Sequence, residues 1–349
     1  MSETKQMETL VWLGPRAIEI QRAAIPELRP GEVLIAVHAA GICGSELSGY
    51  LGQNSLRVPP LVMGHEAAGQ VIQSTQGTFA DESPARVGVR VTFNPLVICG
   101  ECDRCRVGLT NLCRQRQLIG AHRPGAFAQF VAVPAKQCYP LPDDLSDTLA
   151  SLTEPLACSL RAVKLTGVRP EQSLLILGAG PIGLFALIAA RASGIQRVYV
   201  SDLSESRLEV ARQWGASETI NVQQHDVPAT IQKIALGGVD TVIDAVGAGA
   251  TRAQALQAVI PGGTVVFIGL HDETSSLAAN YLVRQEITIR GSFSYDQSDF
   301  KRAFDFLTQG LLQAGTIWLE ERPLAAGPSS FAQLVDGQVA ATKIVLRVD

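Results

Sequence analysis

The sequence lacks the features that would place a chain in several special classes of protein. Lys and Arg total 29 against 33 Asp and Glu, and no basic patch stands out, which argues against a nucleic-acid partner. No apolar run approaches the roughly 20 residues that a membrane helix needs, and the N-terminus lacks the apolar core of a secretory leader. Internal repeats and low-complexity segments are absent as well. We therefore expect a soluble, cytoplasmic protein whose partners include neither nucleic acid nor a membrane.

The length and the residue pattern predict more than one domain. A chain of 349 residues exceeds one ordinary core, and its 46% hydrophobic and 18% charged residues are normal for a globular enzyme. The first part of the chain holds short β-branched or alternating runs between Gly and Pro residues. These runs predict strands at 32–38, 68–72, 87–93 and 128–133, and therefore a β-rich domain.

From residue 173 to about 290 the pattern changes to apolar strands that alternate with helices. Strands are predicted at 173–177, 197–201, 241–244 and 264–268, and helices begin at Pro181, Ser204 and about Thr251. This rhythm predicts βαβ units and a parallel sheet that is covered on both faces. The tail holds a predicted helix over 299–309 and a strand over 342–348. Because it is too short to fold alone, we expect it to return to the first domain.

Four cysteines lie close together in the pattern C-x2-C-x2-C-x7-C. They are Cys99, Cys102, Cys105 and Cys113, in a polar segment rich in Gly, Arg and Asp. Zn²⁺ in structural sites takes a closed tetrahedron of soft ligands from such a tight loop. Cytosolic chains rarely hold disulfides, so the pattern favours a structural zinc site over cystines.

A glycine-rich turn follows the apolar run 174–177. Its sequence is G-x-G-x-x-G, formed by Gly178, Gly180 and Gly183 with Pro181 and Ile182 between them. After a strand and before a helix, such glycines allow a tight turn and a close approach of the backbone to a pyrophosphate. The phosphates then lie at a helix N-terminus, where free N–H groups favour negative charge.

Asp202 ends the next predicted strand, 19 residues after Gly183. An acid there accepts hydrogen bonds from the ribose hydroxyls and repels a 2′-phosphate, so NAD is favoured over NADP. The alternative is a turn of glycines with an Asp that only caps a helix.

A second set of possible metal ligands is spread along the chain. Cys43 lies between glycines, His65 and Glu66 follow Gly64, and Glu154 precedes a proline. Taken singly, each has an ordinary explanation. A lone Cys is often a small buried hydrophobe, a lone His is often a hydrogen-bonded core residue, and an acid before Pro can begin a helix.

Together these motifs resemble the zinc-containing medium-chain dehydrogenases, the superfamily of alcohol and polyol dehydrogenases. The resemblance covers essentially the full length and keeps the order GICGSE, GHEAAG, the four-cysteine lobe, TEPLACSL, GAGPIG and YVSDLSESR. It is strongest to the sorbitol and polyol branch, where a Glu before Pro replaces a second Cys of the alcohol dehydrogenases. It implies an α/β protein: a GroES-like β-rich catalytic domain, 1–153 completed by 291–349, and a doubly wound Rossmann NAD-binding domain, 154–290.

The resemblance also implies roles for particular residues around a catalytic zinc. Cys43 and His65 would hold the metal, Glu66 would be an alternating ligand, and Glu154 would bind directly or through water. Ser45 would hydrogen-bond the substrate oxygen and accept its proton.

For the cofactor, the resemblance places Arg207 beside the adenosine ribose and Lys343 near the pyrophosphate. The alternative for Arg207 is a solvated helix face. Relatives carry a relay histidine five residues after the first ligand, and here that position is Ser48. Serine cannot store a proton near neutral pH, so the sequence leaves the relay group open.

The predicted activity is hydride transfer between a secondary alcohol or polyol and NAD, with two zinc ions per chain, in a homodimer or homotetramer. One alternative is a dehydrogenase of a 3-hydroxy amino acid of the threonine type, or of a sugar-alcohol phosphate. Another is a non-catalytic NAD-binding relic, against which the retained ligands argue. The segment 49–60 with Tyr50 is expected to line the substrate site. His122 and Arg123 either reach that site or belong to an exposed polar loop.

Overall fold

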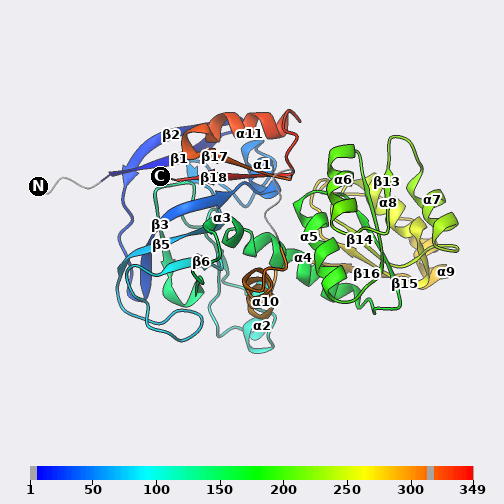
Figure 1. Cartoon of the computed structure of the whole chain (residues 1–349), viewed down its shortest axis with the longest axis horizontal. Helices are drawn as coiled ribbons and strands as arrows, with labels where there is room; N and C mark the ends of the chain where they lie inside the picture. Colours follow the sequence, from blue (N-terminus) through cyan, green and yellow to red (C-terminus); the bar gives the residue numbers. More distant parts are fainter. Residues whose placement is uncertain (1–5, 313–317, 349) are drawn as a thin grey trace, which may run out of the picture. The chain divides into compact units, whose positions relative to one another are not determined.

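The computed structural model describes residues 6–312 and 318–348 (Figure 1). The chain divides into two compact units. Unit 1 comprises Met1–Glu154 and Phe300–Asp349, and unit 2 comprises Pro155–Asp299. The domain boundaries drawn from the sequence, at 153/154 and 290/291, stay predictions.

Unit 1 is built mainly from antiparallel strands. Its seven-stranded sheet has the order β10-β6-β5-β3-β18-β17, with β9 also paired to β3. The strands are β3 (Glu32–Gly41), β5 (Glu66–Ser74), β6 (Arg90–Phe93), β9 (Phe130–Pro134), β10 (Cys138–Pro140), β17 (Leu319–Pro323) and β18 (Lys343–Arg347). A three-stranded sheet contains β1 (Gln6–Gly14), β2 (Ala17–Ala24) and β4 (Leu61–Val62), and a two-stranded one pairs β7 (Leu96–Val97) with β8 (Gln117–Leu118). Its helices are α1 (Gly44–Tyr50), α2 (Asp103–Arg106), α3 (Asp147–Ala150) and α11 (Gly327–Val335).

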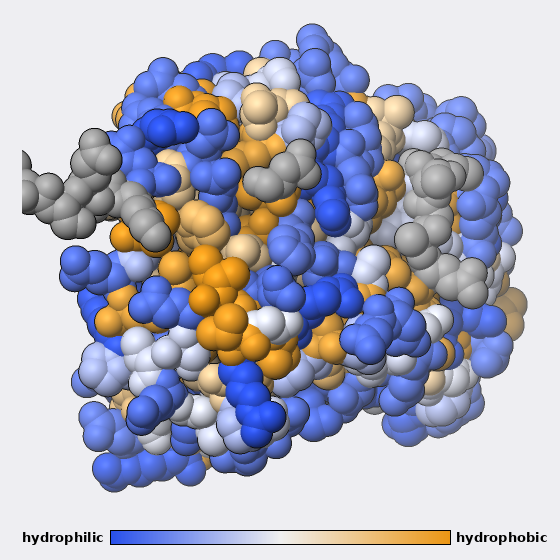
Figure 2. Space-filling model, turned by 60° about the vertical axis from the view of Figure 1, so that its left-hand side comes forward, coloured by the Kyte–Doolittle hydropathy of each residue, from blue (hydrophilic) through white to orange (hydrophobic). Residues whose placement is uncertain are grey.

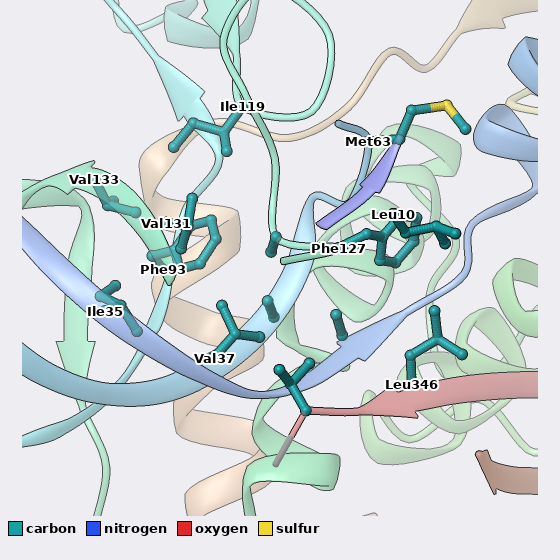
Figure 3. Close-up of a cluster of buried hydrophobic side chains, with 14 of the residues drawn as sticks. Leu10, Ile35, Val37, Met63, Phe93, Ile119, Phe127, Val131, Val133 and Leu346 are labelled. Carbon is teal, nitrogen blue, oxygen red and sulfur yellow. The ribbon is translucent and has the colours of Figure 1, made fainter. Parts of the chain in front are cut away.

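Strand β3 is the centre of unit 1. Its inward-facing Ile35 and Val37 join Phe93, Phe127 and Leu346 in one apolar cluster (Figure 3), in which each of these side chains is at most 2% exposed. Burial of each such side chain stabilises the fold by roughly 1.5–3 kcal/mol. The sheet is therefore a rigid support for whatever its strand ends carry.

The tail returns to this sheet. β18 pairs antiparallel with β3 and places Val345 opposite Gly41, while β5 on the other side of β3 places Glu66 opposite Gly41. The pairing brings the C-terminal strand next to residues from the first fifth of the chain at one end of the sheet.

Unit 2 holds a parallel six-stranded sheet with the order β13-β12-β11-β14-β15-β16. The strands are β11 (Ser173–Leu177), β12 (Arg197–Asp202), β13 (Glu218–Asn221), β14 (Val239–Asp244), β15 (Val259–Phe267) and β16 (Thr288–Gly291). The helices are α5 (Pro181–Ala192), α6 (Glu205–Gln213), α7 (Val227–Ile234), α8 (Gly249–Ala258) and α9 (Ala279–Gln285), while α4 (Thr153–Thr166) and α10 (Gln297–Thr308) cross the unit boundaries. The predicted mixed α/β fold, with a β-rich part and a parallel sheet, is confirmed.

Helices cover both faces of this sheet. Leu175 and Leu177 pack with Ile231 of α7 and Leu256 of α8, whereas the alternate residue Ile176 faces α5, where a Cβ on Gly183 would lie 3.3 Å from it. The strand order reverses between β11 and β14, so the open position for a ligand lies beyond the ends of these two strands.

No helix among the described residues is long and apolar enough to span a bilayer. On the face in Figure 2, hydrophilic residues alternate with several groups of hydrophobic residues, the most extended of them left of the centre.

Candidate metal and cofactor sites

Three of the predicted ligands meet in unit 1. Cys43 directly precedes α1, and His65 and Glu66 stand where the chain enters β5. One ligand atom from each of Cys43, His65 and Glu66 lies within 4.8 Å of the other two. Gly64 has φ +102°, and a Cβ there would lie 2.6 Å from the backbone N of Phe127, so this turn requires glycine.

Glu46 holds this group together, although the sequence analysis gave it no role. Its buried carboxylate accepts hydrogen bonds from the backbone N–H of Cys43 at 3.0 Å and of Gly64 at 2.8 Å. It also lies 2.7 Å from Nδ1 of His65. That contact directs Nε2 of His65 toward the ligand position, the usual role of a carboxylate behind a metal-bound histidine. The signal in the sequence was an acid three residues after the ligand Cys, in the first turn of a helix.

The charges in this group are strongly coupled. Burial disfavours the Glu46 carboxylate, but His65, Arg57 and the N–H of Cys43 outweigh it, so the pKa of Glu46 is lowered. Burial likewise disfavours the His65 imidazolium, yet Glu46 and Cys43 raise the pKa of His65 well above its usual value. Each of these two charges is therefore favoured by a neighbour of opposite sign.

Lys343, predicted near a pyrophosphate, lies in unit 1 and is 2% exposed. Its ammonium pairs with Oε2 of Glu66 and donates to the carbonyl of Ile42 at 2.9 Å. Burial opposes the charge, but Glu66 and Cys43 raise the pKa of Lys343. Its contact with a cofactor stays a prediction.

The donor set fits zinc. Sulfur, imidazole nitrogen and carboxylate oxygen are all ligands that Zn²⁺ accepts in sites with an open position. Oε1 of Glu66 is fully buried and has no partner among the described residues, so a cation would satisfy it. Glu154 lies buried at the start of α4 and is not one of the three grouped residues. Its role as a ligand stays a prediction.

Ser45 lies next to the group. Its hydroxyl is 3.4 Å from Sγ of Cys43, which suits a contact to a substrate on the metal. Ser48 instead donates to the carbonyl of Gly44 within α1. Tyr50 is 5% exposed and donates to the carbonyl of Arg16, so it belongs to the core rather than to a substrate wall.

The two residues whose place the sequence left open lie outside this group. Arg123 pairs with Glu32, and Nδ1 of His122 accepts from the backbone of Leu118. The exposed His122 fits the alternative of an exposed polar loop, whereas Arg123 is only 14% exposed in its ion pair.

The four-cysteine lobe forms a second, closed site. The sulfur atoms lie 3.5 Å apart in Cys113–Cys99, 3.6 Å apart in Cys102–Cys105, and 4.0 Å apart in both Cys99–Cys105 and Cys102–Cys113. A tetrahedron with Zn–S bonds of about 2.3 Å has edges of about 3.8 Å, so the lobe has the size of a zinc site. All four cysteines are free thiols, and the predicted structural zinc site is confirmed.

The thiols of the lobe differ in their protonation. Backbone N–H groups of Arg114 and Cys105 lower the pKa of Cys102 to about 6, whereas burial and neighbouring thiols raise the pKa of Cys105 to about 12. A divalent cation would take the place of the protons on these thiols, because the metal binds the thiolate form.

In unit 2, the glycine-rich turn lies where the strand order reverses. Gly178 has φ +97°, and a Cβ on Gly183 would lie 1.8 Å from the carbonyl O of Gly178, so both positions require glycine. A Cβ on Gly180, at the N-terminus of α5, would meet nothing within 4 Å. That open space in front of helix N–H groups, next to Pro181 and Ile182, fits a pyrophosphate.

Asp202 closes the same turn. Its Oδ2 accepts from the N–H of Ala179 at 2.7 Å and its Oδ1 from that of Ser204 at 2.8 Å. Each oxygen keeps a lone pair for a ribose hydroxyl. Arg207 lies half-buried in the first turn of α6, and its place beside a ribose stays a prediction.

Comparison with known families matches both parts of the chain. Residues 29–143 match the alcohol dehydrogenase GroES-like domain, and residues 181–309 match the zinc-binding dehydrogenase family. A sorbitol dehydrogenase of Bacillus subtilis is 34% identical over 315 residues, 88% of each chain. An L-threonine 3-dehydrogenase of Pyrococcus abyssi is 36% identical over 282 residues, 79% of this chain and 78% of that protein.

Solved structures agree over nearly the whole chain. An Escherichia coli alcohol dehydrogenase complexed with NADH has a TM-score of 0.90 at 27% identity, covering 98% of this chain and 99% of that one. A Sinorhizobium meliloti protein bound to NADP has a TM-score of 0.88 at 29% identity, again covering 98% and 99%.

Proposed function

Since the chain belongs to the zinc-containing medium-chain alcohol dehydrogenase family, we propose that it oxidises a secondary alcohol or polyol with NAD⁺. The observation that carries the proposal is the group formed by Cys43, His65 and Glu66, with the hydroxyl of Ser45 beside it. The family gives a zinc-dependent, NAD(P)-linked dehydrogenase, and the proposal adds the substrate class and the preference for NAD.

Each residue has a distinct task in this proposal. A zinc ion held at the site supplies Lewis acidity toward the substrate hydroxyl, and NAD⁺ supplies the hydride acceptor. Ser45 accepts the hydroxyl proton, and Glu46 holds His65 in the tautomer that can bind metal. Glu154 completes the ligand set directly or through water.

The preference for NAD rests on Asp202. Its carboxylate already orients the glycine-rich turn through Ala179, and its charge would oppose the 2′-phosphate of NADP. Arg207 and Lys343 complete the predicted cofactor contacts.

The polyol class is supported by the B. subtilis sorbitol dehydrogenase at 34% identity and by Glu154 in its Thr-Glu-Pro segment. The second candidate is a 3-hydroxy amino acid, because the P. abyssi L-threonine 3-dehydrogenase is 36% identical. The free thiols of the lobe support a reducing, cytoplasmic compartment. β16 at one edge of its sheet supports assembly into a homodimer or homotetramer through strand pairing.

A substrate scan tests the proposal. Zinc-loaded protein is assayed for NAD⁺ reduction with simple secondary alcohols, hexitols, threonine and polyol phosphates, and metal analysis should give two zinc ions per chain. Cys43→Ser is the matched control and should abolish turnover while NAD⁺ still binds. Faster oxidation of threonine would select the second candidate. A chain with one zinc ion and no turnover on any substrate would refute both.

A further inference from the structure

A buried arginine that favours the negative charge of Glu46 also lies next to the proton-accepting serine. Arg57 is 3% exposed and lies in the segment after α1. Its Nη2 donates to Oγ of Ser45 at 3.2 Å, and its Nη1 donates to the carbonyl of Ser45 at 3.1 Å. Among the ion pairs between described residues, none includes Arg57, so this cation is held by a serine rather than by a carboxylate.

The surrounding elements leave room for this side chain. A Cβ on Gly49 would lie 2.8 Å from Cδ of Arg57, and Met63 flanks the same position at 3.4 Å. The backbone N–H of Arg57 donates to the carbonyl of Asn54, whose amide in turn donates to the carbonyl of Ser45. The guanidinium is therefore held by its hydrogen bonds to Ser45 of α1, and the segment that carries Arg57 is held to the same serine through Asn54.

The hydrogen bond from Arg57 leaves Ser45 one lone pair that can accept a proton. A serine hydroxyl has one hydrogen and two lone pairs. Arg57 occupies one lone pair, and the hydrogen is directed toward Sγ of Cys43 at 3.4 Å. The second lone pair remains to receive the proton of a substrate hydroxyl. Nε of Arg57 is buried and has no hydrogen-bond partner among the described residues, and the charge of Arg57 acts on the Glu46 carboxylate without an ion pair between the two.

We propose that Arg57 is a positioning residue for alcohol oxidation, which holds Ser45 and places fixed positive charge beside the substrate oxygen as that oxygen loses its proton. The inference rests on the proposed function. The substrate proton passes to Oγ of Ser45, and the serine hydrogen turns away from Sγ of Cys43 and leaves to solvent water. The carbon would give up its hydride to NAD⁺ bound beside it. Arg57 keeps all its protons throughout. Its fixed positive charge favours loss of the proton from the substrate hydroxyl, in a chain that has Ser48 where relatives have a relay histidine.

The test measures binding of an alcohol that resists oxidation. The probe is 1,1,1-trifluoropropan-2-ol, titrated into the zinc-loaded protein with NAD⁺ bound. Arg57→Gln should weaken probe binding roughly 10- to 100-fold, the size of a charge-assisted hydrogen bond, with zinc content and NAD⁺ affinity unchanged. Arg57→Lys should recover part of the loss. Gly49→Ala, which pushes the arginine stem aside without removing its charge, should show a smaller loss.

A matched control separates positioning from stability. Arg90→Gln removes an arginine that bonds Asp147 and the carbonyl of Leu145 in the same unit, and it should leave probe binding unchanged. Equal probe affinity in wild type and Arg57→Gln would overturn the inference alone, as would a loss of zinc or NAD⁺ binding that matches the loss of probe. Wild-type protein that neither binds the probe nor oxidises any alcohol would overturn the proposed function and the inference together. If Arg57→Gln does not fold, the Lys and Gly49→Ala variants decide.

Discussion

At the scale of single residues, the metal group depends on a carboxylate that is not one of its three grouped ligands. Glu46 is fully buried, and one of its oxygens serves both Gly64 and His65. Glu46→Gln replaces the charge with an amide that cannot accept all these bonds, so His65 loses its fixed orientation. Zinc affinity at this site should fall roughly 10- to 100-fold, as for other partners of ligand histidines. Competition for zinc with a chromogenic chelator measures this affinity in wild type and variant. Glu320→Gln, which removes a carboxylate paired with Arg322 away from the metal group, is the control, and equal zinc affinities of wild type and Glu46→Gln would contradict the assigned role.

Asp202 gives a second prediction at this scale. Asp202→Ala removes the acceptor for the ribose hydroxyls and also the charge that would repel a 2′-phosphate. NAD⁺ affinity should drop roughly 10- to 100-fold, while NADP⁺ affinity changes much less. Fluorescence titration with both cofactors decides the matter. A uniform loss would mean that the residue only supports the turn through Ala179.

At the scale of elements, the four-cysteine lobe has little apolar material to hold it. α2 has no buried residue, and its lobe is tied by the paired hydrogen bonds of Arg114 to Asp103. Metal binding must therefore supply most of its folding free energy. Cys102→Ser should cost a few kcal/mol and lower Tm by roughly 5–10 °C, while the folded fraction keeps its kcat. Calorimetry and active-site titration measure the two effects. A stable but inactive variant would contradict a structural role.

Sequence patterns predicted these elements unevenly. The strand 173–177 and the helix from Pro181 match β11 and α5, because an apolar run into a glycine-rich turn allows few other structures. The strand at 264–268 is β15 over Val259–Phe267, and α7, α9, β13 and β16 were not predicted. β16 has only four residues and no buried one. Its place comes from pairing with β15, which no local pattern encodes.

The same limit applies to the site. Cys43 and His65 were found because their motifs are local, and Glu46 could have been found from its place in a first helical turn. Arg57 gives no local signal, since its importance comes from reaching back to Ser45. Likewise, Lys343 meets Glu66 only because β18 and β5 flank β3.

At the scale of the whole molecule, metal and cofactor belong to different units. Both metal groups lie in unit 1, and the glycine-rich turn lies in unit 2. Removing zinc should therefore loosen unit 1 while the parallel sheet keeps its hydrogen bonds. In hydrogen exchange, a chelator should speed exchange at 43–66 and 96–118 and leave β11 and β14 unchanged. NAD⁺ should instead slow exchange at 178–184 and at Asp202. If chelation exposed β11 as much as the cysteine lobe, the two units would share one cooperative transition, and the metal would stabilise the whole chain rather than its own sheet.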